Sequence, residues 1–107
     1  MPWSRDDRIF VLALFKVLQP SYSRKDPRVL EAARVTGTCQ GDRSPDSIVY
    51  KLQNFRYLGT NGKSGFSHYA LEDKEVWKEF KGREEDLRTE AERIRSGKKK
   101  ECEEKNQ

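Results

Sequence analysis

The sequence has few of the residues from which metal sites and membrane spans are built. Among its 107 residues are two cysteines and one histidine, His68. A structural zinc site needs about four ligands at short paired spacings, which this set does not supply. The longest apolar run, Ile9 to Phe15, is much shorter than the roughly 18 residues of a membrane span. We therefore expect no metal, no cofactor and no contact with a membrane.

The two cysteines, Cys39 and Cys102, lie far apart, and Cys102 falls in a highly charged C-terminal segment. Because we expect that segment to be disordered, we expect no structural disulfide. The N-terminus carries acidic residues where a secretory signal peptide has positive charge before an apolar stretch. These features predict a cytoplasmic protein.

Large apolar residues are also scarce. Leu, Ile, Val and Phe account for 22 residues, just above the level of about 20% below which charged chains tend to stay unfolded. Residues 96–107 contain no apolar residue except Cys102, so burial there cannot offset the entropy lost on ordering. We predict one small domain over residues 1–95 and a disordered charged tail over residues 96–107.

Positive charge is in excess in only part of the chain. Residues 1–70 contain 11 Lys and Arg against 6 acidic residues, a net charge of +5, whereas residues 71–107 contain 11 against 12, a net charge of −1. A basic segment attracts phosphate groups through its long-range field. The distribution is compatible with a nucleic acid or an anionic surface as the partner of the first two thirds of the chain. The alternative is that it binds nothing acidic, since modest positive charge is also common among such proteins.

Start and stop signals predict five helices. Ser4, Asp26 and Ser44 have the pattern of N-cap residues, and proline follows the last two at the first helical position. Apolar residues then recur at helical spacing. The predicted helices run from Ser4 to about Leu18, where Pro20 ends the first, and then over Pro27 to Thr36, Pro45 to Tyr57, Asp73 to Gly82 and Glu84 to Arg95.

Residues 59–65, between the third and fourth predicted helices, are rich in turn formers. Asn61-Gly62 is the favoured pair for a tight hairpin, and residues 57–58 and 66–71 are its expected strands. Three helices followed by a glycine hairpin is the element order of a winged helix-turn-helix, whose third helix enters the major groove. We predict a mainly α, winged helix-turn-helix-like fold with three helices, a short glycine-rich hairpin and two C-terminal helices.

The third predicted helix carries a row of hydrogen-bonding side chains. With its apolar row turned inward, we expect Ser47, Lys51 and Asn54 on the opposite, open face. Asn suits adenine, Lys suits guanine or phosphate, and hydroxyls suit phosphate. An ordinary solvated helix face is the alternative. The predicted nucleic-acid-binding residues of this helix, its flanks and the hairpin are Arg43, Ser44, Ser47, Tyr50, Lys51, Asn54, Arg56, Asn61 and Lys63.

Two enzyme motifs match only in part. Gly62-Lys63-Ser64 matches the end of a phosphate-binding loop, but Tyr57 stands where its first glycine belongs. Asp46 with Glu72-Asp73-Lys74 matches the string of metal-dependent nucleases, but Asp46 lies in a helix start and Asp73 in a cap position. We predict that the protein is not an enzyme and takes no small-molecule substrate, with cleavage through Asp46, Glu72 and Lys74 as the weakest alternative.

Aromatic residues also have two interpretations. Trp3, Trp77 and Phe80 are the type of side chain on which single-stranded bases stack. Each lies on an apolar stripe, so we expect them to pack in the core. We expect His68 to be a surface or half-buried residue, with a phosphate contact as the alternative.

Two sequence strings together resemble a known family. Residues 47–55 match S-[IV]-x-x-K-L-x-N-[FL], and residues 75–80 match an acidic residue followed by V-W-x-x-F. With the Trp3 to Asp7 segment, they resemble the N-terminal module of HNH-type restriction endonucleases related to the modified-cytosine enzymes, over about Pro2 to Arg95. The resemblance implies a DNA-binding or modification-sensing role for Ser47, Lys51 and Asn54. Because the HNH nuclease half is absent from this sequence, we expect binding without cleavage.

We therefore predict a non-catalytic module that binds duplex DNA in a restriction or modification-sensing context, with a separate nuclease as a further candidate partner. The third helix is expected in the major groove and the hairpin on the DNA backbone. The alternative from another class is a protein-interaction adaptor. It would use the alternating charges from Arg83 to Arg95 and the C-terminal tail.

Overall fold

The part of the chain that the structure describes folds into five α-helices, as predicted. The computed structural model describes residues 2–18 and 21–105. The helices are α1 (Arg5–Val17), α2 (Pro27–Val35), α3 (Pro45–Gly59), α4 (Leu71–Glu79) and α5 (Glu84–Lys105). Pro20, which we expected to end the first helix, lies outside the described residues. Within the described ranges, no helix combines the length and hydrophobicity that crossing a membrane requires.

The first three helices begin at the predicted caps. The Ser4 hydroxyl accepts a hydrogen bond from the Asp7 amide at 3.0 Å, and the Asp7 carboxylate accepts one from the Ser4 amide. Asp26 accepts from the Arg28 amide at 2.8 Å, and Ser44 accepts from the Ser47 amide at 3.1 Å. These bonds satisfy backbone donors that the helix itself leaves without partners.

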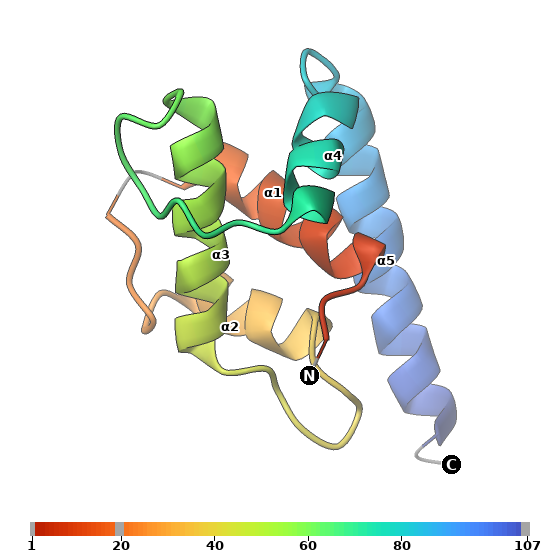
Figure 1. The fold of residues 1–107 in the computed structure, drawn as a ribbon. Helices are drawn as coiled ribbons and strands as arrows, with labels where there is room; N and C mark the ends of the chain where they lie inside the picture. Colours follow the sequence, from red (N-terminus) through yellow and green to blue (C-terminus); the bar gives the residue numbers. More distant parts are fainter. Residues whose placement is uncertain (1, 19–20, 106–107) are drawn as a thin grey trace.

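Helix α1 lies at the centre of the molecule, with α3 on one side and α5 on the other (Figure 1). It contacts all four other helices, whereas α3 and α5 share no contact within the described residues. Ile9, Val11 and Leu12 of α1 are at most 1% exposed. The apolar side chains of this central helix are therefore buried on several sides.

The C-terminal segment is helical, which corrects the predicted disordered tail. Residues 96–105 continue α5, whereas residues 106–107 lie outside the described part. The buried stripe of Leu87, Ala91 and Ile94 is followed at the same helical spacing by Lys98 and Cys102. Over the last turns of α5, contacts of Lys98 and Cys102 therefore take the place of the buried apolar side chains that hold the earlier turns.

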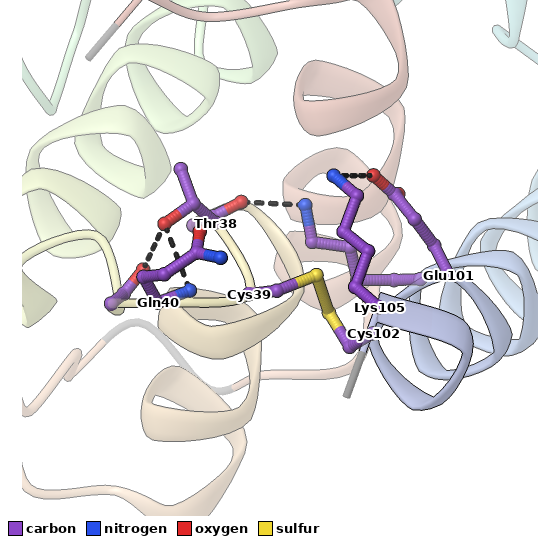
Figure 2. Close-up of a disulfide and its surroundings, with 9 residues drawn as sticks. Thr38, Cys39, Gln40, Glu101, Cys102 and Lys105 are labelled. Carbon is purple, nitrogen blue, oxygen red and sulfur yellow. Dashed lines mark hydrogen bonds and ion pairs between the residues drawn. A yellow bond between two sulfur atoms is a disulfide. The ribbon is translucent and has the colours of Figure 1, made fainter. Parts of the chain in front are cut away.

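Cys102 forms a disulfide with Cys39, which corrects the prediction of no structural disulfide. Cys39 lies in the loop after α2, and Figure 2 shows it joined to Cys102 on the neighbouring face of α5. Their Cα atoms are 5.2 Å apart, a common separation for a disulfide. The Lys98 ammonium donates to the Gly37 carbonyl at 2.6 Å, one turn away. The prediction was wrong because it treated the segment that carries Cys102 as unfolded.

No strands form within the described residues, so the glycine-rich hairpin predicted after the third helix is absent. Asn61 instead ends α3 in the left-handed conformation, with φ of 53°. The Asn61 amide donates to the Leu58 carbonyl at 3.4 Å, and the Gly62 amide donates to the Tyr57 carbonyl at 2.9 Å. This is the bonding pattern of a Schellman helix end. The Asn-Gly pair suits both turns, and here it terminates a helix.

The chain then folds back onto α3 instead of projecting from it. The Phe66 amide donates to the Gln53 carbonyl at 3.0 Å. Gly65, with φ of 97°, approaches so closely that a Cβ atom there would lie 2.4 Å from the same carbonyl oxygen. Residues 60–70, which we call the α3–α4 loop, therefore cover part of the surface that the sequence predicts to be open.

Candidate nucleic-acid interface

Three of the nine predicted nucleic-acid-binding residues are buried. Arg43, Lys51 and Asn54 are 5%, 6% and 1% exposed, so the open recognition row predicted for the third helix does not exist as such. The row that begins at Ser47 precedes the buried row that begins at Ile48 by one residue, which is a rotation of about 100° around the helix. It therefore flanks the buried row and does not lie opposite it.

Lys51 is held by an acidic residue of α4. Its Nζ atom donates to Asp73 Oδ2 at 2.8 Å, and Arg8 Nε of α1 donates to Asp73 Oδ1 at 2.9 Å. Asp73 is fully buried and also accepts from the Ala70 amide at the start of α4. A buried carboxylate requires such partners. Lys51 thus joins α3 to α4 and does not face a ligand.

Arg43 binds the N-terminal segment. Its guanidinium lies 3.9 Å from the centre of the Trp3 ring and donates to the Pro2 and Thr36 carbonyls at 2.9 and 3.2 Å. Asp7 Oδ2 accepts from it at 3.1 Å. Burial lowers the pKa of Arg43 from its ordinary value, although Asp7 opposes that effect. Arg43 is therefore a structural cation.

Asn54 fixes the α3–α4 loop. Its Nδ2 atom donates to the Phe66 carbonyl at 3.0 Å. Its Oδ1 atom is buried and has no hydrogen-bond partner among the described residues. The amide therefore stabilises the loop that covers it, and it does not reach a base edge.

The other six predicted residues remain accessible and are spread from the start of α3 to the loop beyond its end. Ser44 and Ser47 share a hydroxyl–hydroxyl hydrogen bond of 2.9 Å at its start. Asn61 and Lys63 lie beyond its end, about 20 Å away for a helix of 15 residues. Exposed or half-buried at these two ends and between them are Ser44, Ser47, Tyr50, Arg56, Asn61 and Lys63.

A concave basic surface lies at the second of these ends. It is a cavity of about 350 Å³ between the end of α3, the α3–α4 loop and α4. We call it the lysine cavity, and its lining residues are Tyr57, Leu58, Asn61, Gly62, Tyr69, Lys74, Trp77, Lys78 and Lys81. Of the predicted set, only Asn61 lines it, and Lys63 follows in the loop two residues later.

Three lysines of the lysine cavity share one side of α4 and the turn after it. Lys74 and Lys78 are four residues apart and lie on one face of α4, and Lys81 follows in the turn after the helix. All three line the same cavity. Within the described ranges, none of them forms an ion pair. Their charges are therefore available to an anionic ligand.

Aromatic rings form the other part of the lysine cavity. The Tyr57 and Tyr69 ring centres are 5.9 Å apart. Trp77 packs against Phe15 and Phe55, with ring centres 5.9 and 6.5 Å away. Trp77 is thus fixed by the core, as its apolar stripe predicts, while it also lines the cavity.

The lining of the lysine cavity, as far as the described residues form it, contains no carboxylate. Four further cavities in the described part of the chain each contain at least two acidic side chains. This difference singles out the lysine cavity as a site for anions. The stripe Lys74, Lys78 and Lys81 could have been found from spacing alone, but the net charge of −1 over residues 71–107 drew attention away from it.

Part of the charged face of α5, on which an adaptor would depend, is paired with acidic residues of the chain itself. Arg93 pairs with Glu90 and with Asp6 of α1, and Arg95 pairs with Glu31 of α2 at 2.9 Å. Such pairs favour a role of these charges in holding α5 to the rest of the fold.

The residues of the two partial enzyme motifs lie as follows. Asp46 is in the first turn of α3, 3.7 Å from Arg24, and Glu72 is in the first turn of α4, 3.7 Å from Arg8. No group of three potential metal ligands occurs among the described residues. After Ser64 no helix begins until Leu71, unlike in a phosphate-binding loop. His68 is exposed.

Comparisons with known proteins return no match, whether with family models, with curated proteins or with solved structures.

Proposed function

We propose that the protein is a non-catalytic nucleic-acid-binding module and that the lysine cavity is its binding site. The observation that carries this proposal is the stripe of three lysines beside aromatic rings, without an ion pair or a lining carboxylate among the described residues. A positive groove combined with aromatic side chains is the usual composition of a surface that binds nucleic acids without a fixed sequence.

The binding chemistry follows from the side chains. Lysine ammonium groups neutralise phosphates and release condensed counterions, which makes binding strong at low salt. Asn61 at the edge of the cavity offers an amide donor and an acceptor to a sugar or a base. Lys63 in the α3–α4 loop follows the lining residue Asn61 by two positions and adds a further cation. The sequence predicts the same residue as a contact in the wing of a winged helix.

We propose DNA as the nucleic acid and a restriction or modification-sensing context, on the strength of the resemblance to HNH-type restriction endonucleases. In that context the module works in the cytoplasm, beside a separate nuclease. The helix-turn-helix order of α1 to α3 also supports the proposal. The proposed contacts with the nucleic acid, however, are made by the lysine cavity beside α4 and not by Lys51 and Asn54 of α3.

Fluorescence anisotropy with labelled oligonucleotides over a range of salt concentrations tests the proposal. The variant Lys74→Gln/Lys78→Gln/Lys81→Gln should bind at least tenfold more weakly than wild type at low salt. Its log–log salt slope should be shallower by about one for each phosphate that the variant no longer neutralises. The matched control is Lys25→Gln/Lys99→Gln/Lys100→Gln, which removes the same charge from exposed residues outside the cavity.

The comparison between the two triple variants separates a site from general electrostatic attraction. The proposal expects the control to keep most of the wild-type affinity and slope. Equal losses in the two variants would mean that net charge alone attracts the nucleic acid. Absence of salt-dependent binding in wild type would remove the proposed function.

A further inference from the structure

We propose that the lysine cavity receives one unpaired nucleotide, so that the module prefers single-stranded or locally opened nucleic acid to an intact duplex. This inference rests on the proposed function and specifies its ligand. The base would lie against the rings of Tyr57, Tyr69 and Trp77, and the phosphates beside it would lie along Lys74, Lys78 and Lys81.

The first argument is shape. Elements that read a duplex project into its grooves, as a recognition helix does. The α3–α4 loop does not project, because Gly65 and Phe66 pack it against the Gln53 carbonyl of α3. The site beside it is hollow and therefore receives a projecting group. In an intact duplex the bases are stacked inside, and only an unpaired or flipped base projects.

The second argument is size and lining. A cavity of about 350 Å³ lies at the small end of the range for ligand sites. Its aromatic part, with Tyr57 and Tyr69 centres 5.9 Å apart, suits the face of one base, since every base has a π-face. Trp77 packs against Phe55 and Phe15, and the Lys16 ammonium lies 4.5 Å from its ring centre, so this side chain does not have to be ordered when the ligand binds.

The third argument is the arrangement of charge. Lys74 and Lys78 lie one turn, about 6 Å, apart along α4, and Lys81 follows in the turn after the helix; all three line the cavity. A strand that places a base in the cavity therefore passes several phosphates along these lysines. No carboxylate among the described lining residues opposes that path. Shape, aromatic lining and charge all fit a nucleotide in a strand.

Anisotropy with four oligonucleotides of one sequence tests the inference: single-stranded DNA, single-stranded RNA, the DNA duplex and single-stranded DNA with abasic sites. We expect both single strands that carry bases, or one of them, to bind about tenfold or more tightly than the duplex at the same salt. Abasic DNA should lose that advantage, because base–aromatic stacking alone contributes about this factor. The DNA and RNA arms show which sugar the site accepts.

Variants of one aromatic residue complete the test. Tyr69→Leu should weaken single-strand binding about tenfold without changing the salt slope, whereas Tyr69→Phe should retain it, because only the ring is required. The control is Tyr50→Leu, which removes a tyrosine that is 45% exposed and lies outside the lysine cavity. Thermal unfolding of each variant checks that the fold is kept.

Two results would overturn the inference and leave the proposed function standing. One is equal affinity for the duplex and the single strands, and the other is unchanged affinity in Tyr69→Leu while the triple lysine variant still loses binding. Loss of all salt-dependent binding in the wild-type protein would overturn both.

Discussion

The Nζ atom of Lys51 and the Oδ2 atom of Asp73 lie 2.8 Å apart in a buried ion pair that joins α3 to α4. Arg8 of α1 occupies the other oxygen of the same carboxylate at 2.9 Å. One buried acid thus holds two cations from two other helices. Because α4 carries the lysines of the proposed site, this contact also positions the binding surface.

Asp73→Asn should therefore destabilise the protein more than Lys51→Met. Loss of Lys51 leaves Asp73 paired with Arg8, and we expect a cost of about 3 kcal/mol, at the lower end for breaking a buried pair. Loss of the carboxylate leaves the buried Lys51 ammonium without an ion-pair partner among the described residues and leaves Arg8 with only the more distant Glu72 and the Trp3 carbonyl, and we expect a cost of about 4 kcal/mol or more. Urea denaturation measures both. The reverse order would show that Lys51, and not Asp73, is the centre of this network.

The same two residues explain what the sequence could and could not reveal about the site. Lys51 sits between apolar positions of α3, and its buried partner is 22 residues away on another helix, so local spacing could not identify the pair. The starts of the first three helices were predictable because a cap such as Ser4 or Ser44 is bonded within three residues, whereas α4 begins at Leu71, before the predicted cap Asp73. Burial is decided by contacts between residues that are far apart in the sequence, and local sequence spacing does not reveal such contacts.

Two other differences arise from motifs that serve more than one structure. Asn61-Gly62 satisfies the backbone of a hairpin turn and of a Schellman helix end, and the long helix before it selects the second. Lys98 and Cys102 continue the stripe of Leu87, Ala91 and Ile94 at the same helical spacing. A search for aliphatic residues at that spacing does not find them, because neither is aliphatic. Their partners, the Gly37 carbonyl and Cys39, come from the loop after α2.

The Cys39–Cys102 disulfide should contribute about 3 to 4 kcal/mol to the free energy of unfolding. It closes a loop over a sequence separation of 63, and the entropy that such a link removes from the unfolded chain grows with loop length. Denaturation of wild type with and without a thiol reductant, compared with Cys39→Ser/Cys102→Ser, measures the contribution.

Reduction should act locally as well. Beyond Ile94, the described part of α5 has no fully buried side chain, so we expect amide exchange over residues 96–105 to accelerate when the disulfide opens. In a reducing cytoplasm, the proposed location, this would be the prevailing state. The double serine variant should match reduced wild type and should not respond to the reductant. Unchanged protection of residues 96–105 would show that Lys98 and the packing of α5 suffice.

Two glycines should respond to alanine in opposite directions. At Gly65, φ is 97° and a Cβ atom would lie 2.4 Å from the Gln53 carbonyl oxygen, so Gly65→Ala should destabilise the protein by more than about 1 kcal/mol. At Gly97, inside α5, a Cβ atom would meet nothing within 4 Å, so Gly97→Ala should stabilise it by about 0.5 to 1 kcal/mol. Thermal or urea unfolding of the pair measures both. A neutral Gly65→Ala would mean that the α3–α4 loop does not pack on α3 as described.

The exposed ion pair of Arg5 and Glu79 should make the protein slightly more stable at neutral pH than at acidic pH. The Arg5 guanidinium donates to both carboxylate oxygens of Glu79, at 2.7 and 2.5 Å, and these hydrogen bonds lower the pKa of Glu79 below its ordinary value of 4.5. A lowered folded-state pKa means that the pair stabilises the protein above pH 4.5 and that this gain is lost as pH falls through the folded-state value. Because both side chains are largely solvated, the gain should stay below about 1 kcal/mol.

An NMR titration of the Glu79 carboxyl in wild type and in Arg5→Gln measures the shift, which the variant should abolish. The stability difference between the two proteins should be larger at pH 7 than at pH 3, and a Glu79 that titrates normally in wild type would show that the pair does not persist in solution.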